Sequence, residues 1–166
     1  MKFVTTMTWE APLDRMLAMV TDPRYVERKT QLMNYLDYEI LSCDTVDDVF
    51  TARVKVTDRP SIQLPAFAQR FVKQDQPLVM DQVDTWDKST ATGEVVLENR
   101  SVNVVKIRAG MALSELDGIT TNTLHWVVTC SVPLVGGKLA AMIADDIREK
   151  ASRTEKVSRQ VLNELF

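Results

Sequence analysis

Residues 133–165 are PLVGGKLAAMIADDIREKASRTEKVSRQVLNEL, a short break rich in proline and glycine followed by one long amphipathic segment. From Lys138 to Leu165, one set of side chains repeats at the helical period and falls within a sector of about 80°. The set is Leu139, Ile143, Ile147, Thr154, Val157, Val161 and Leu165. The other face carries i, i+4 charge pairs typical of an exposed helix surface, namely Asp146–Lys150, Glu149–Arg153 and Glu155–Arg159. The pattern predicts a C-terminal helix over 138–165 that buries one face.

Two adjacent glycines, Gly136 and Gly137, precede this helix. Because glycine tolerates backbone conformations that other residues avoid, we expect the pair to form a strand-to-helix corner. A phosphate-binding loop is not indicated, since Leu139 stands where such a loop needs Ser or Thr and Val132 stands where it needs its first glycine.

Upstream of the break, apolar and polar residues alternate in a series of segments, as in half-buried strands. The predicted strands are 2–9, 39–43, 49–56, 78–87, 90–98, 102–116 and 120–132. Helical periodicity predicts two short helices, 12–20 and 24–36, after the first strand, and Asp117-Gly118 is a hairpin turn signal. Consecutive strands joined by turns, followed by one helix, predict an α+β fold with an antiparallel sheet in a single domain, residues 1–166.

This order of elements resembles the START-like superfamily, also called Bet v 1-like, polyketide-cyclase-like or SRPBCC, and within it an uncharacterised bacterial family. The matching pieces are Pro133–Leu139, Ala11-Pro12, Thr21-Asp22-Pro23-Arg24-Tyr25 and Trp86, and the resemblance spans residues 1–165. It implies a helix-grip fold, in which a curved antiparallel sheet of about six to seven strands wraps around a long C-terminal helix. It also implies a cavity between sheet and helix that binds lipids, sterols, polyketides or other apolar small molecules.

Composition excludes several classes of protein. The chain has 20 Lys and Arg against 23 Asp and Glu, a net charge of −3, so no basic excess is available to neutralise nucleic acid. Threonines interrupt the N-terminal apolar residues and no apolar run reaches 18 residues, which predicts a cytoplasmic protein without an integral membrane span. Cys43 and Cys130 lack metal-ligand spacing and are predicted to be buried free thiols.

The apolar stripes of the predicted elements define a candidate ligand cavity. Its expected lining is Trp9, Val54, Phe67, Phe71, Trp86, Ile107, Met111, Trp126, Ile143, Ile147, Ala151 and Thr154. Small side chains near the middle of the last helix, Ala151, Thr154 and Ser158, indicate either a cavity there or a bulky partner such as Trp126 that fills the space.

The apolar segment 62–72 connects two strands. It is either ordinary core packing or a lid in which Ile62, Leu64, Phe67 and Phe71 cover the cavity mouth and allow transient contact with a membrane surface.

The polar residues do not form a recognised catalytic, metal or cofactor motif, so none of these sites is predicted. His125 is the single histidine and alternates away from the apolar face, and Asp81, Asp84 and Asp87 are expected to be solvated. The leading prediction is binding or transfer of a hydrophobic small molecule or lipid. One alternative is a cyclase- or aromatase-type enzyme that uses Asp84, Gln82, Arg108 and Tyr38; another is a regulatory or protein-interaction domain. The oligomeric state is left open.

Overall fold

The computed structural model describes residues 1–60, 63–70, 73, 75–100 and 104–166. Within these residues, seven antiparallel strands form one sheet in the order β1-β7-β6-β5-β4-β3-β2. The strands are β1 (Lys2–Trp9), β2 (Asp37–Val46), β3 (Val49–Asp58), β4 (Leu78–Asp87), β5 (Thr92–Asn99), β6 (Val105–Leu116) and β7 (Ile119–Cys130). The helices are α1 (Leu13–Val20), α2 (Pro23–Leu32) and α3 (Gly136–Leu165), with a short 3₁₀ turn, η1 (Ala68–Arg70), between β3 and β4.

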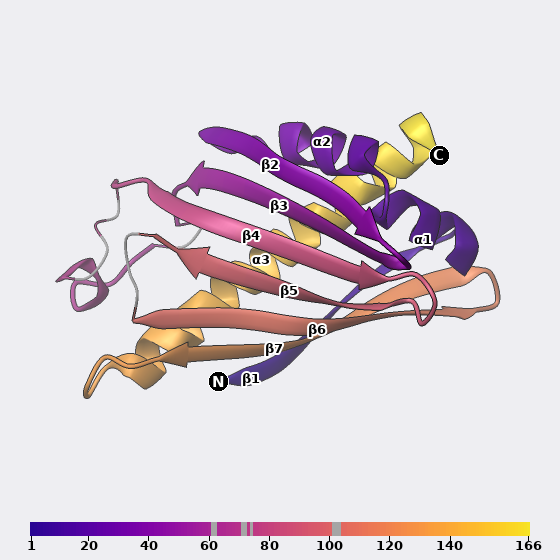
Figure 1. Ribbon diagram of the computed structural model, residues 1–166. Helices are drawn as coiled ribbons and strands as arrows, with labels where there is room; N and C mark the ends of the chain where they lie inside the picture. Colours follow the sequence, from indigo (N-terminus) through magenta and orange to yellow (C-terminus); the bar gives the residue numbers. More distant parts are fainter. Residues whose placement is uncertain (61–62, 71–72, 74, 101–103) are drawn as a thin grey trace.

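The sheet curves around α3, which crosses its concave face (Figure 1). The α1–α2 pair covers the end of the sheet near the C-terminal half of α3, and the connection between β3 and β4 lies at the opposite end. This arrangement confirms the predicted α+β helix-grip fold.

The helix pair has local causes. Asp22 caps α2, because its Oδ1 atom accepts a hydrogen bond of 2.7 Å from the backbone N–H of Arg24, and Pro23 occupies the first turn. The helix ends at Leu32, earlier than the predicted 36, where Asn34 adopts a left-handed backbone with φ of 54°.

A strand-to-helix corner is present before α3, but unusual backbone conformations of the two glycines are not its cause. Neither Gly136 nor Gly137 has a positive φ, whereas Leu134 does, with φ of 66°. Gly136 is needed for close approach, since a Cβ atom at that position would lie 2.6 Å from the carbonyl oxygen of Cys130. α3 therefore begins at Gly136 itself, two residues earlier than expected.

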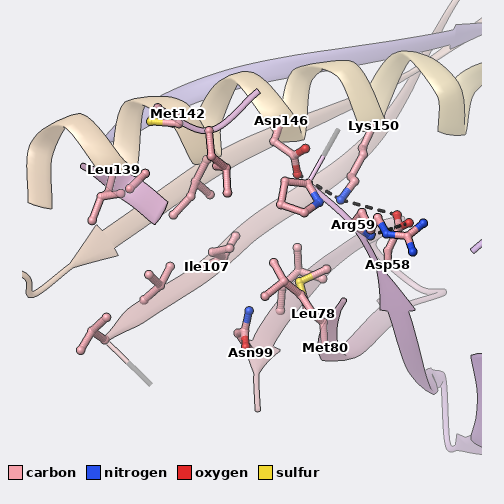
Figure 2. Close-up of a pocket in the computed structure, with 17 residues that line it drawn as sticks. Asp58, Arg59, Leu78, Met80, Asn99, Ile107, Leu139, Met142, Asp146 and Lys150 are labelled. Carbon is pink, nitrogen blue, oxygen red and sulfur yellow. Dashed lines mark hydrogen bonds and ion pairs between the residues drawn. The ribbon is translucent and has the colours of Figure 1, made fainter. Parts of the chain in front are cut away.

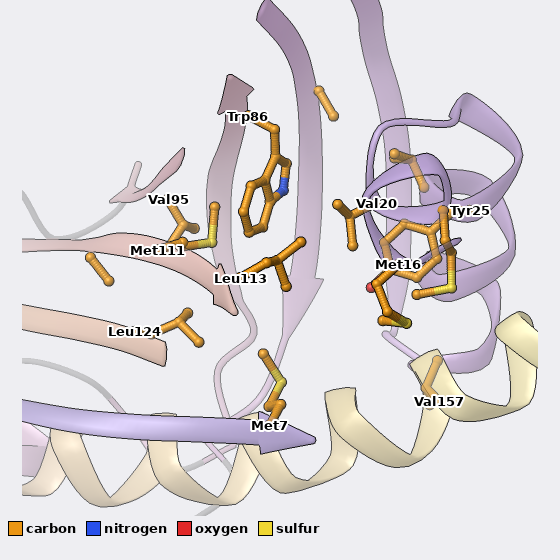
Figure 3. Close-up of a cluster of buried hydrophobic side chains, with 14 of the residues drawn as sticks. Met7, Met16, Val20, Tyr25, Trp86, Val95, Met111, Leu113, Leu124 and Val157 are labelled. Atoms are coloured by element: carbon orange, nitrogen blue, oxygen red, sulfur yellow. The ribbon is translucent and has the colours of Figure 1, made fainter. Parts of the chain in front are cut away.

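The core lies between the sheet, the helix pair and the C-terminal half of α3. Figure 3 shows Met16, Val20 and Tyr25 of the helix pair on one side of the cluster and Trp86 and Leu113 of the sheet on the other. Alternate residues of β3 are buried, namely Phe50, Ala52, Val54 and Val56. The alternation of each strand thus fixes which of its residues face α3.

The two thiols are free, but both are half-buried and not buried as predicted. Burial raises the pKa of the Cys43 thiol, with a further contribution from the charge of Asp44. Cys43 lies on β2, the edge strand of the sheet, and the carbonyl of Cys130 lies beside Gly136 at the corner, so neither thiol reaches the fully enclosed core.

Candidate functional site

An inner and an outer compartment occupy the space between the concave face of the sheet and α3 in the part of the chain that the structure describes. The inner one, about 170 Å³, extends beneath α2 and reaches Thr154, whereas the outer one, about 130 Å³, lies along the N-terminal half of α3. The residues that line both are Met80, Leu97, Ile107, Ile143, Asp146 and Lys150. The compartments therefore meet at a common wall of four apolar and two charged side chains.

The outer compartment is mostly apolar. Figure 2 shows Leu139 and Met142 of α3 facing Ile107, Leu78 and Met80 of the sheet. Leu64 and Ala68, from the connection between β3 and β4, also line it. The described part of the predicted lid thus borders this compartment.

A three-membered ion-pair group lies where the compartments meet (Figure 2). Lys150 Nζ is 3.0 Å from Asp146 Oδ2 and 3.8 Å from Asp58 Oδ2, at the end of β3. The three side chains are only 16–21% exposed. The Asp146–Lys150 pair was expected on the solvated face of the helix; this is wrong, because the turn of α3 that bears it crosses the open end of β3.

The inner compartment contains a second charged group. Lys29 Nζ of α2 lies 3.5 Å from Asp84 Oδ2 of β4 and 5.2 Å from the centre of the Tyr25 ring. Gln82 Nε2 donates to both carboxylate oxygens of Asp84, at 3.0 and 2.9 Å. These polar atoms lie among apolar side chains, so the cavity has one polar wall.

Lys29 is held in its charged form. Burial by itself lowers the pKa of Lys29, but the negative charges of Tyr25, Asp84 and Tyr35, the tyrosines when ionised, outweigh burial and raise that pKa. The side chain is therefore an ammonium at neutral pH, a hydrogen-bond donor and not an amine nucleophile. Burial also raises the pKa of the Tyr35 phenol, which lines the same compartment.

The expectation that Asp84 is solvated is wrong. Asp84 lies on the same face of β4 as Gln82 and Trp86, and this face is turned toward α2 and α3. Of the four residues named for an enzyme, Asp84 and Gln82 line the cavity, whereas Arg108 and Tyr38 are exposed. His125 is exposed, as predicted.

Lys29 is a cavity residue that was not predicted from the sequence. The residue belongs to a polar stretch, Glu27–Gln31, that is typical of a solvated helix face. One signal was available, because Lys29 is spaced i+4 and i+3 from the buried residues Tyr25 and Val26, and Met33 follows at i+4. A lysine on the apolar stripe of a helix indicates a buried partner.

Most of the twelve expected cavity residues meet in the inner compartment. Its lining includes Trp9, Trp86, Ile107, Met111, Trp126, Ile143, Ile147, Ala151 and Thr154. Thr154 Oγ1 lies 3.9 Å from Met33 Sδ, and Ser158 Oγ shares a hydrogen bond of 2.8 Å with the Tyr25 hydroxyl. The small residues of α3 thus divide into two that border the cavity, Ala151 and Thr154, and one that packs against Tyr25.

The remaining expected residues lie elsewhere. Val54 is buried in the core, outside the lining of either compartment. The half-buried Phe67 ring lies 5.9 Å from Lys138 Nζ, beside the outer compartment and not in its lining. Phe71 and Ile62 are outside the described residues.

The described residues do not include a group of three or more His, Cys, Asp or Glu side chains arranged to hold a metal ion. In the same part of the chain, none of the helices combines the length and apolar character that a membrane span requires.

The sequence of the chain matches one known protein family. Residues 5–162 match the family model described as "Protein of unknown function (DUF2505)". The chain belongs to the DUF2505 family. Because the match covers both the sheet and α3, the compartments of this DUF2505 protein lie within the family region. Comparison with curated protein sequences finds no match to the chain.

Solved structures resemble this DUF2505 protein over nearly its whole length. The protein TTHA0849 from Thermus thermophilus is 11% identical with a TM-score of 0.69, and 99% of this chain aligns with 98% of that one. The Zhui aromatase/cyclase from Streptomyces sp. R1128 is 11% identical with a TM-score of 0.66, covering 98% and 93%. A START superfamily protein from Mycobacterium smegmatis is 11% identical with a TM-score of 0.55, covering 99% of both chains. The DUF2505 chain therefore has the START-like fold.

Proposed function

We propose that this protein binds and transfers a hydrophobic small molecule or lipid in the cavity between the sheet and α3. The observation that carries the proposal is the space beside Ala151 and Thr154, at the centre of the domain. Protein interiors are packed to crystal-like density, so space at such a position is costly unless a ligand uses it. The apolar lining of both compartments favours an apolar ligand.

The proposal is tested by looking for a bound ligand and by asking whether a side chain that fills the cavity prevents its binding. Native mass spectrometry of the purified protein should reveal co-purified small molecules, and delipidated protein should bind members of a panel of fatty acids, sterols and fused-ring phenols. Ala151→Phe should abolish binding, because its ring occupies the inner compartment. Ser152→Phe, the same change at the adjacent exposed position, should leave binding intact. A ligand-free protein that also ignores the whole panel would overturn the proposal.

Transfer requires the ligand to enter from a donor surface, and transient contact with a membrane is the route we infer. Leu134 is fully exposed in the loop just before α3 begins at Gly136. The outer compartment is lined by the N-terminal half of the same helix, from Leu139 onward. Leu134→Ser should reduce co-sedimentation with phosphatidylcholine vesicles. Leu116→Ser, at the exposed tip of the β6–β7 hairpin, is the matched control and should have no effect. If wild-type protein, Leu134→Ser and Leu116→Ser sediment equally with the vesicles, membrane contact through Leu134 is excluded as the route of ligand entry.

A second candidate is an enzyme of the cyclase or aromatase kind, favoured by the Lys29–Asp84 pair in an apolar cavity. A carboxylate beside an ammonium suits proton transfer at the carbon next to a ketone: Asp84 accepts the proton, and Lys29 donates a hydrogen bond to the enolate oxygen. The Zhui aromatase/cyclase shares the fold. 2-Tetralone in D₂O is a suitable probe, since its acidic C–H groups should exchange faster with wild-type protein than with Asp84→Asn. Equal exchange rates would reject the enzyme hypothesis.

A further inference from the structure

Two buried polar atoms in the inner compartment lack a hydrogen-bond partner among the described residues. They are Nε1 of Trp9 on β1 and Oδ1 of Asn122 on β7. Trp9 is 3% exposed and Asn122 is 4% exposed. Leaving such groups unpaired costs stability, so a buried donor and acceptor on a cavity wall indicate a binding partner.

Neighbouring buried polar groups are satisfied, which sets these two atoms apart. Trp126 Nε1 donates to Thr5 Oγ1 at 2.9 Å, and Thr120 Oγ1 donates to the Ala11 carbonyl at 2.7 Å. The third unpaired atom is Asp81 Oδ1, but the other oxygen of that carboxylate accepts a hydrogen bond of 2.6 Å from Arg100. Within the described part of the chain, Trp9 and Asn122 are the residues that carry a buried, unpaired polar side-chain atom and also line this compartment.

The sheet register places this donor and this acceptor close together. Asn122 is opposite Met7, and Trp9 is two residues beyond Met7 on the same face of β1. Such diagonal neighbours lie about 7 Å apart at the backbone, with side chains somewhat closer. A single oxygen atom that makes two hydrogen bonds of about 3 Å each bridges two groups that lie up to about 6 Å apart.

The chemistry of the pair selects one class of ligand group. A protonated amine would satisfy the Asn122 acceptor alone, and a ketone would satisfy the Trp9 donor alone, whereas a hydroxyl both accepts and donates. Both protein groups are neutral, and their neighbours Met7, Met111 and Leu124 are apolar. A charged ligand group would therefore lose its hydration at this position without a counter-charge.

We propose that Trp9 and Asn122 form a hydroxyl-binding subsite, and that the ligand is an uncharged apolar alcohol or phenol whose oxygen bridges Trp9 Nε1 and Asn122 Oδ1. This inference rests on the proposed ligand-binding function and names its ligand class. The Lys29–Asp84 pair, on α2 and β4, lines the same compartment and remains available to a second polar group of the same molecule.

The test uses two probes of nearly equal shape, 2-naphthol and 2-methylnaphthalene, in calorimetric titrations. Wild-type protein should bind 2-naphthol about tenfold more tightly, as expected for pairing two buried groups. Trp9→Phe and Asn122→Leu should each reduce the affinity for 2-naphthol toward that for 2-methylnaphthalene, which should itself change little. Thr120→Val is the matched control, because the hydroxyl that it removes is already bonded to the Ala11 carbonyl and Thr120 is outside the lining of the compartment; it should keep the preference.

Nuclear magnetic resonance supplies a readout that does not depend on variants. The chain has three tryptophans, so three indole N–H signals are expected. The Trp9 signal should move downfield with 2-naphthol and not with 2-methylnaphthalene, while the Trp126 signal should keep its position. Equal affinity of wild-type protein for both probes, or loss of the preference in Thr120→Val as well, would overturn the subsite and leave the cavity function standing. If neither probe binds, both the hydroxyl-binding subsite and the proposed ligand-binding function are contradicted.

Discussion

Lys29 Nζ lies 3.5 Å from Asp84 Oδ2, and this ion pair between α2 and β4 faces the cavity and not solvent. The two side chains are 14% and 20% exposed. Their positions are 55 residues apart in the chain, so the pair ties the helix pair to the middle of the sheet. It also gives the mostly apolar compartment a charged group that is separate from Asp146 and Lys150.

Lys29→Met should destabilise the protein by about 2 kcal/mol, because it leaves the Asp84 carboxylate in the cavity without its cation. Adding Asp84→Asn should cost less than the sum of the two single changes, since the unpaired charge is then absent. Urea unfolding at pH 7 measures both values. Lys55→Met is the control: it breaks an ion pair with Glu39 on the outer face of the sheet and should change stability little. Additive effects of the first two changes would contradict coupling between Lys29 and Asp84.

The same pair predicts a pH dependence in the alkaline range. The pKa of Lys29 is raised above its ordinary value of 10.5, so its contribution to stability is complete below that value and is lost as pH rises through the folded-state pKa. The difference in unfolding free energy between wild type and Lys29→Met should therefore be equal at pH 7 and pH 9 and should shrink above about pH 10.5. A difference that grows with pH would show that Lys29 is not stabilised as an ammonium.

Filling the inner compartment should separate a cavity from a packed core. Ala151→Leu and Thr154→Leu each add volume where α3 borders the compartment. In a filled core, overpacking costs about 1 to 3 kcal/mol, whereas in a cavity the same change is neutral or stabilising and reduces ligand uptake. We expect the second result, measured by thermal unfolding and by binding of the same panel. Loss of stability in both variants with unchanged binding would contradict a cavity at this position.

The sequence predicted the fold well because strand alternation and helix periodicity are local signals. The Asp117-Gly118 turn illustrates this: both residues have positive φ, 52° and 77°, as the two-residue hairpin requires. The face of each strand follows from the same alternation, so most of the expected cavity residues meet in one compartment. Local patterns thus determine which side chains point toward α3.

The polar side of the site was not predictable in the same way. Charged residues are solvated by default, and no local pattern states that Lys29 on α2 meets Asp84 on β4, or that α3 brings Lys150 to Asp58. These pairings depend on how helices cross the sheet. Asn122 lies on the same face of β7 as Leu124 and Trp126, but an unpaired buried amide is recognised only when its neighbours in the structure are known.

Gly136→Ala should destabilise the strand-to-helix corner, because the new Cβ would lie 2.6 Å from the Cys130 carbonyl oxygen, a backbone atom that cannot rotate away. We expect a loss of about 1 to 3 kcal/mol in urea unfolding. Gly137→Ala is the matched control: its Cβ would meet no described atom within 4 Å, and alanine favours the helix. If the two variants have equal stability, the close approach at Gly136 is not a constraint.

The last prediction concerns the connection between β3 and β4, of which residues 63–70 are described. Leu64 and Ala68 line the outer compartment, and the backbone N–H groups of Ala68 and Gln69 donate to the Pro65 carbonyl in a local turn and not to a strand. Amides outside a strand ladder exchange readily, so hydrogen exchange here should be faster than in β3 and β4.

Ligand should slow exchange in residues 63–70, because an occupied outer compartment gives Leu64 and Ala68 an apolar surface to pack against. The tightest ligand of the binding panel is the probe, and mass spectrometry of peptides from this stretch is the measurement. Leu64→Ser should weaken the protection that the ligand confers, whereas Gln63→Ser, at the exposed neighbouring position, should not. Exchange as slow as that of the sheet, with and without ligand, would make this connection ordinary core and not a lid.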